Sequence, residues 1–146
     1  MRICVISDTH THSIDNLPRE VLGELSGADM IIHAGDFTSK RLVDALRKIG
    51  PFRGVYGNID GPEVRKELPA IDTIRAEDFM IGVNHPAEGG SPHTLQHRLR
   101  PKFPGSKRLF MVTLIGLRTI FGTAFSGSIL VAQREGFLRR RKLTEF

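Results

Sequence analysis

The chain has 146 residues, which is enough for one domain with a single hydrophobic core and too few for a two-domain enzyme. Apolar residues make up 40% of it and charged residues 25%, with 15 Gly and 8 Pro, which excludes collagen-like, disordered and disulfide-stapled chains. The single cysteine, Cys4, cannot form an internal disulfide, and the opening MRICVISDTH has no apolar signal-peptide segment with a cleavage site. We therefore expect a cytoplasmic protein.

The basic excess behind the net charge of +5 lies entirely in the last part of the chain. Residues 1–105 hold 13 Lys and Arg against 14 Asp and Glu, whereas residues 106–146 hold 8 against 2. Asp, Asn, His and Pro do not occur after residue 105. The basic cluster Arg139 to Lys142 has no interleaved aromatic residues and no nucleic-acid motif, so we predict no specific nucleic-acid binding.

Residues 1–105 alternate between predicted strands and predicted helices. Apolar, β-branched runs predict strands over Arg2–Ser7, Met30–His33, Phe52–Tyr56, Ile71–Ile74 and Phe79–Val83. Helices are predicted from Asn16 to Gly27, from Thr38 or Ser39 to Gly50, from Pro62, and from Ser91 to about Arg100. This alternation predicts an α/β layered core.

Polar side chains follow four of these strands. The clusters are Asp8-Thr9-His10, Gly35-Asp36, Gly57-Asn58 and Asn84-His85. Because the carboxyl ends of strands gather in one crevice in layered α/β folds, we expect these groups to converge. Carboxylate and amide oxygens mixed with imidazole suit Mn²⁺, Fe²⁺, Zn²⁺ or Mg²⁺, and two such ions about 4 Å apart can bind a phosphate ester and activate water. The pattern predicts phosphoester hydrolysis.

The order and spacing of these motifs resemble a known family. Asp8-x-His10, Gly35-Asp36, Gly57-Asn58-x-Asp60 and the strand-borne His85 are similar to the calcineurin-like metallophosphoesterases. The resemblance is to the small bacterial and archaeal phosphodiesterases related to the retromer cargo subunit. It implies an α/β fold, a layered two-sheet β-sandwich flanked by helices, with residues 1–105 as the metallophosphoesterase domain.

The same resemblance implies a set of site residues. Asp8 and His10 would hold the first metal, Asp36 would bridge, and Asn58 with His85 would hold the second. Two divalent ions are implied, with manganese favoured over magnesium, iron, nickel or zinc. The implied reaction is hydrolysis of a small-molecule phosphodiester or phosphomonoester by metal-activated water, with no catalytic side chain beyond that water. This chain departs from the family at Ile59, where larger relatives carry a catalytic histidine, and at Pro86, where glycine is usual.

The family's C-terminal motifs, Gly-His-x-His followed by Asn-Pro-Gly-Ser, are absent from this chain. Displacing the reading frame one base upstream permits Val-Glu-Ala-Ile-Ile-Tyr-Gly-His-Thr-His-Arg-Pro from Ser106–Leu117, which restores the first motif. The same displacement permits Asn-Pro-Gly-Ser-Pro-Thr-Gly-Arg from Ile129–Gly136, at the family's spacing. We therefore interpret 106–146 as an aberrant, frameshifted tail. We expect the enzyme to be impaired by the loss of two histidine ligands.

Several residues have a second interpretation. His33 lies in an apolar run, where a core or supporting role is favoured over ligation. His12 follows Asp8-x-His10 and would contact the substrate phosphate or simply face solvent. His93 and His97 are spaced i, i+4, but the pattern favours a solvated helix face.

The chain as a whole also has alternatives. Met111–Ala132 has the length of a membrane span, although Arg118 makes a membrane location disfavoured. An incomplete sheet would leave an open edge, which favours self-association into a homo-oligomer. The alternative function is a non-catalytic scaffold of the same fold that binds a protein partner.

Overall fold

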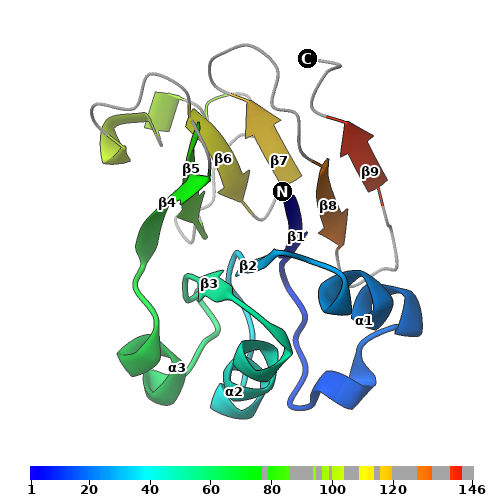
Figure 1. Ribbon diagram of the computed structural model, residues 1–146. Helices are drawn as coiled ribbons and strands as arrows, with labels where there is room; N and C mark the ends of the chain where they lie inside the picture. Colours follow the sequence, from blue (N-terminus) through cyan, green and yellow to red (C-terminus); the bar gives the residue numbers. More distant parts are fainter. Residues whose placement is uncertain are drawn as a thin grey trace.

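The computed structural model describes residues 1–76, 79–85, 94, 97–98, 100–103, 109–113, 116–119, 128–132 and 139–142. Within these ranges the strands form two sheets, one ordered β3-β2-β1-β8-β9 and the other β4-β5-β6-β7 (Figure 1). The strands are β1 (Arg2–Ile6), β2 (Met30–His33), β3 (Phe52–Gly54), β4 (Ile71–Ala76), β5 (Phe79–Asn84), β6 (Leu109–Thr113), β7 (Gly116–Thr119), β8 (Ser128–Ala132) and β9 (Arg139–Lys142). The helices are η1 (Ile14–Asn16), α1 (Arg19–Ser26), α2 (Lys40–Ile49), α3 (Pro62–Glu67) and η3 (Arg100–Lys102).

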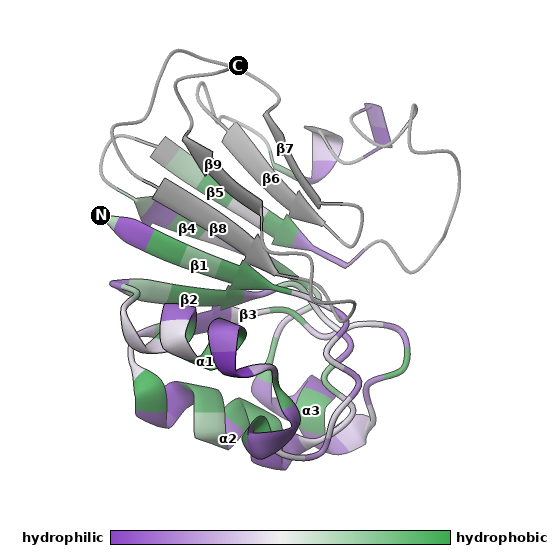
Figure 2. Ribbon diagram, turned by 90° about the vertical axis from the view of Figure 1, so that its right-hand side faces the viewer, coloured by the Kyte–Doolittle hydropathy of each residue, from purple (hydrophilic) through white to green (hydrophobic). Residues whose placement is uncertain are grey.

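The predicted layered α/β sandwich is confirmed. The two sheets stack face to face, and α1, α2 and α3 lie on the other side of the first sheet (Figure 2). Successive residues of β1 point to opposite faces, as a pleated strand requires. Ile3 and Val5 therefore pack between the sheets with residues of β4 and β5, whereas Cys4 and Ile6 pack against the helices. Apolar burial on both faces explains why β1 is a continuous apolar run.

The first three strands of the chain run parallel and in close register. Ile3 pairs with Met30 and Ile6 with His33, and His33 in turn pairs with Gly54. Their carboxyl ends consequently lie side by side, which places the residues after each strand at one edge of the sheet. β5 reaches the same edge from the second sheet, because Gly35, just after β2, lies against His85, just after β5.

Some element boundaries differ from the sequence prediction. The first α-helix begins at Arg19 rather than near Asn16, which instead ends the short η1 turn. Leu17 is extended because a residue before proline is disfavoured in the helical region, and Pro18 therefore becomes the cap of α1. β3 ends at Gly54, and β4 continues to Ala76 because its ladder with β5 extends to the pair Ala76 and Phe79.

The described parts of 106–146 add strands to both sheets. β6 pairs with β5 in parallel, and β8 pairs with β1 in parallel along its whole length. The stretches 111–113, 116–119 and 128–132 are strands, so they do not form the single helix that the membrane-span alternative requires. In the part of the chain that the structure describes, no helix is both long enough and apolar enough to span a membrane.

Candidate metal centre

Two tight loops after β1 and β2 position the first group of predicted ligands. Asp8, His10 and Asp36 all have positive φ, at 54°, 45° and 62°. The loops are joined by backbone hydrogen bonds, in which the Asp8 N–H donates to Gly35 O at 3.0 Å and the His10 N–H donates to Asp36 O at 3.2 Å. Non-glycine residues rarely adopt this conformation except where the surrounding structure enforces it, and such residues cluster at functional sites.

Asp8, His10 and Asp36 converge on one point. One candidate ligand atom from each lies within 4.8 Å of the others. His10 Nε2 is 3.8 Å from Asp8 Oδ1 and 3.7 Å from Asp36 Oδ2. Two carboxylates and an imidazole at this separation form a donor set that suits a divalent cation.

His85 approaches Asp36 from the second sheet. Its Nε2 lies 3.5 Å from Asp36 Oδ2 and 3.0 Å from Asn58 Oδ1, and its Nδ1 lies 2.9 Å from Ala34 O. A carbonyl oxygen only accepts, so the Nδ1–H donates to Ala34 O, and in the neutral ring Nε2 presents a lone pair. That lone pair faces two further oxygens. Such a cluster fits a cation, and an N–H bonded to a backbone carbonyl is typical of metal-ligating histidines.

The structure thus brings together all five side chains that the sequence singled out as ligands. Asp36 is the common member, because one of its oxygens, Oδ2, lies near both His10 and His85. Its other oxygen, Oδ1, accepts the Ile59 N–H at 3.2 Å. Its side chain is only 6% exposed, so its position is set by the surrounding backbone.

Burial raises the pKa of the Asp8 carboxyl, and the hydrogen bond from the Ser7 hydroxyl opposes this shift. A raised pKa means that this carboxyl binds its proton more tightly than an exposed aspartate does. Because a metal requires the ionised carboxylate, metal binding here competes with that proton and weakens as the pH falls.

Three supporting residues had no assigned role in the sequence analysis. The Asp60 carboxylate, from the same loop as Asn58, accepts backbone N–H groups of the Asp36 and Asn58 loops. Arg65, from α3, donates to carbonyl oxygens of that second loop. The Ser7 hydroxyl donates to Asp8. Only Asp60 had a sequence signal, its place in the motif Gly57-Asn58-x-Asp60.

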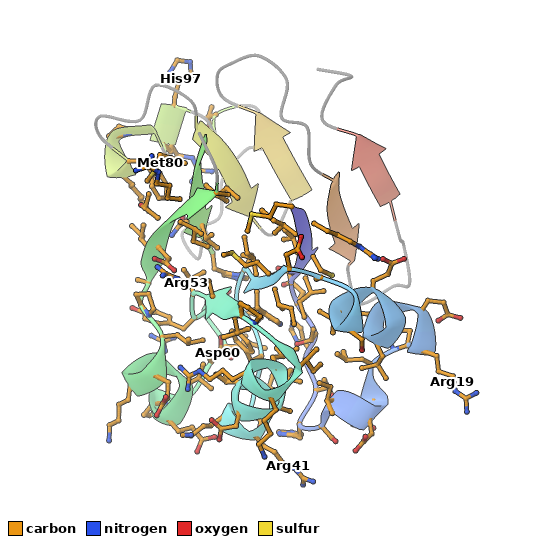
Figure 3. All side chains as sticks on the ribbon, viewed as in Figure 1. Arg19, Arg41, Arg53, Asp60, Met80 and His97 are labelled. Atoms are coloured by element: carbon orange, nitrogen blue, oxygen red, sulfur yellow. The ribbon has the colours of Figure 1, made fainter. Side chains whose placement is uncertain are left out.

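The remaining sequence candidates are distributed around this centre. His33 is buried, in agreement with the core or supporting role that its apolar run favoured. His12 is exposed on the loop that follows His10. His97 is also exposed and lies at the end of the molecule opposite Asp60 (Figure 3). His93 and Pro86 lie outside the described residues.

Comparison with known proteins identifies the family. The profile of the calcineurin-like phosphoesterase superfamily domain matches residues 1–112. The chain belongs to this superfamily. The family predicted from the sequence motifs is therefore confirmed, and a calcineurin-like phosphoesterase domain implies a site for divalent metal ions.

Individual relatives agree with this family assignment. The chain is 40% identical over 86 residues to the Methanocaldococcus jannaschii protein named "Probable metallophosphoesterase MJ0623", a match that covers 58% of this chain and 43% of that protein. The matched region thus spans less than half of the relative's length. The solution structure of Thermotoga maritima TM1076 has a TM-score of 0.62 at 27% identity, covering 97% of this chain and 99% of that one.

A second solved structure extends the comparison to the vacuolar sorting proteins. Entamoeba histolytica Vps29 complexed with Zn²⁺ has a TM-score of 0.59 at 20% identity, covering 87% of this chain and 77% of that one. At this identity the likeness shows a shared fold. The relation to the retromer cargo subunit expected from the motifs is thereby confirmed at the level of architecture.

Proposed function

We propose that this chain is a metal-dependent phosphoesterase with a two-cation centre. Asp8 and His10 would hold one ion, Asn58 and His85 the other, and Asp36 would bridge them. The position of Asp36 Oδ2 carries this proposal, since it lies 3.7 Å from the imidazole of His10 and 3.5 Å from that of His85. An oxygen between two ligand pairs is where a bridging carboxylate belongs.

The chemistry follows from the donor set. Two bound divalent ions would supply hydroxide from water near neutral pH and would neutralise charge on the phosphate. Oxygen donors mixed with imidazole favour manganese, with magnesium, iron, nickel or zinc as alternatives. The side chains themselves bind and orient. We propose that His12, which is exposed on the loop after His10, contacts the substrate phosphate.

The residue after Asn58 bears on the substrate class. Ile59 is 43% exposed beside the centre, and its hydrocarbon side chain cannot donate a proton to the oxygen of a leaving group. A leaving group that is already a weak base needs no such proton. We therefore propose substrates with acidic leaving groups and, from the resemblance to small phosphodiesterases, small-molecule phosphodiesters among them, in a cytoplasmic enzyme.

We further propose that residues 106–146 are out-of-frame translation and that the enzyme is impaired as a result. The profile match ends at residue 112, close to the change in composition at residue 105. Without the two histidines of the displaced frame, each ion would lack one imidazole ligand. Weaker metal binding and low turnover follow, because an under-coordinated ion is held by fewer ligand contacts.

Hydrolysis of bis(p-nitrophenyl) phosphate with Mn²⁺ tests these proposals together. We expect slow but metal-dependent release of nitrophenol, and we expect Asp36→Asn to reduce the rate to the enzyme-free background. The matched control is Asp44→Asn, which changes an exposed carboxylate paired with Lys40 on α2. An unaffected rate in Asp36→Asn removes Asp36 from the bridging role, and a rate typical of intact metallophosphoesterases contradicts the impairment.

The alternative of a non-catalytic scaffold is favoured by one observation. The fold is shared with Vps29, a protein named for vacuolar sorting. The same assay separates the two functions. A purified chain that binds Mn²⁺ without hydrolysing any phosphoester supports the scaffold, and analytical ultracentrifugation then shows whether a second copy of the chain is its partner.

A further inference from the structure

Asp60 is a buried carboxylate bonded entirely to backbone N–H groups. The residue is 3% exposed, and Figure 3 shows it in the interior, whereas Arg19 and Arg41 point to solvent. Its Oδ2 accepts the N–H of Asp36 at 3.0 Å and of Gly57 at 2.7 Å, and its Oδ1 accepts the N–H of Thr38 at 2.8 Å. One side chain therefore ties together the loops that carry Asp36 and Asn58.

The backbone that Asp60 contacts is in a strained conformation. Asp36 and Thr38 both have positive φ, at 62° and 75°. Cβ sterics disfavour this region for non-glycine residues, so the loop needs compensating interactions to stay there. Two of the three hydrogen bonds to Asp60 come from these two residues. They hold the conformation that directs the Asp36 carboxylate toward His10 and His85.

Arg65 supports the other of the two loops, the one that carries Asn58. Its Nε donates to Asp60 O at 2.7 Å, and its Nη2 donates to Asn58 O at 2.9 Å. The guanidinium also lies over the ring of Tyr56, 4.9 Å from the centroid. The segment bearing Asn58 is thus fixed by its carbonyls to Arg65 and by the Gly57 N–H to Asp60.

We propose that Asp60 is a positioning residue that sets Asp36 and Asn58 at the separation required for binding two cations. It acts through the backbone, since its oxygens accept N–H groups and leave metal ligation to the other carboxylates. This inference rests on the proposed metal centre. It predicts that Asp60 controls metal affinity although it touches no metal.

The test is a Co²⁺ titration of the full chain, followed by the visible d–d absorption, with urea unfolding in EDTA to measure the stability of the metal-free fold. We expect Asp60→Ala to raise the Co²⁺ dissociation constant about 10- to 100-fold, as removal of residues that orient ligands typically does. Asp60→Asn should have a smaller effect. Its amide oxygen can keep the bonds from Asp36 and Gly57, while its NH₂ faces Thr38 and loses that bond.

A rescue variant separates positioning from a general loss of stability. Glycine adopts positive φ freely, so Thr38→Gly removes the strain that the bond from Thr38 to Asp60 offsets. The Thr38 hydroxyl is buried without a hydrogen-bond partner, so its loss removes no such bond. Thr38→Gly combined with Asp60→Asn should recover most of the Co²⁺ affinity lost in Asp60→Asn. Asp44→Asn is the matched control and should bind Co²⁺ like the unchanged chain.

The outcomes distinguish this inference from the proposed function. If the unchanged chain binds no Co²⁺, the proposed metal centre fails. If it binds Co²⁺ and the Asp60 variants bind it with the same affinity and spectrum, the positioning role is overturned. Weakened binding in Asp60→Asn without rescue by Thr38→Gly also overturns it. If neither the single nor the combined variant folds, Asp60 is a folding residue and the inference is wrong.

Discussion

The His33 imidazole connects the loop after β1 to the loop after β2 through hydrogen bonds to Thr9 and Gly35. Its ring stacks on Phe37 with 3.6 Å between centroids, and its Nδ1 accepts the Gly35 N–H at 3.2 Å. Because Nδ1 is an acceptor, Nε2 carries the proton and donates to the Thr9 hydroxyl at 3.0 Å. Complete burial holds the pKa of His33 well below its usual range, so the ring is neutral in the folded chain.

This shift makes the stability of the metal-free chain depend on pH. His33 takes up a proton in the unfolded chain below about pH 6.5 but not in the folded chain, so the free energy of unfolding decreases as the pH falls. The slope from this single proton is at most about 1.4 kcal/mol per pH unit. We expect His33→Gln to lack this part of the slope in urea unfolding with EDTA between about pH 5 and 8. Equal slopes for the two chains would contradict the neutral, buried ring.

At the scale of single residues, the sequence predicted the convergence of the proposed ligands better than it predicted the groups that position them. Asp8, Asp36, Asn58 and His85 were identified because each lies in a polar cluster that follows a predicted strand and matches a motif of the family. The role of Asp60 depends on hydrogen bonds across 22 and 24 residues, which no local pattern contains. The requirement for glycine at position 57 is also non-local, because a Cβ atom there would overlap with Asp36 Oδ1.

For the helices and strands, the sequence predicted which elements form better than it predicted where they begin and end. Periodic apolar residues predicted α2, and Leu42, Val43 and Leu46 are indeed its buried residues. The start of α1 was wrong because Pro18 acts on the residue before it, which outweighs the capping preference of Asn16. Strand ends were displaced by pairing with a partner strand, as when β5 extends β4 to Ala76.

The N-terminus of α2 offers a test at this scale. Of the two caps that the sequence allowed, the structure uses Ser39, whose hydroxyl accepts the Arg41 N–H at 3.1 Å. Ser39→Ala leaves that N–H without its partner and should lower the free energy of unfolding by about 1 kcal/mol. The control is Ser26→Ala, which removes a hydroxyl that only donates to Leu22 O near the end of α1. Urea unfolding measures both variants. If Ser26→Ala lowers the free energy of unfolding as much as Ser39→Ala does, the capping role is contradicted.

At the scale of the whole molecule, the described strands after residue 105 extend both sheets. β6 is parallel to β5, and Val112 pairs with Val83. Thr113, the last residue of β6, therefore comes next to the end of β5, at Asn84. In the displaced reading frame, Val112 becomes the glycine of Gly-His-x-His, and the two histidines fall at positions 113 and 115. The register of β6 therefore brings position 113, the first of these histidines in the displaced frame, next to the end of β5.

The frameshift interpretation predicts particular bases in the gene. A histidine codon begins with cytosine, and in the displaced frame its first base is the third base of the preceding codon. The third bases of the Val112 and Leu114 codons should therefore both be cytosine. A gene with one base inserted ahead of the Ser106 codon should then encode a chain that binds Co²⁺ more tightly and hydrolyses bis(p-nitrophenyl) phosphate faster, because each ion gains an imidazole. The control encodes alanine at both histidine positions in the displaced frame and should show neither gain. Any other base at either codon position would contradict the frameshift interpretation of 106–146.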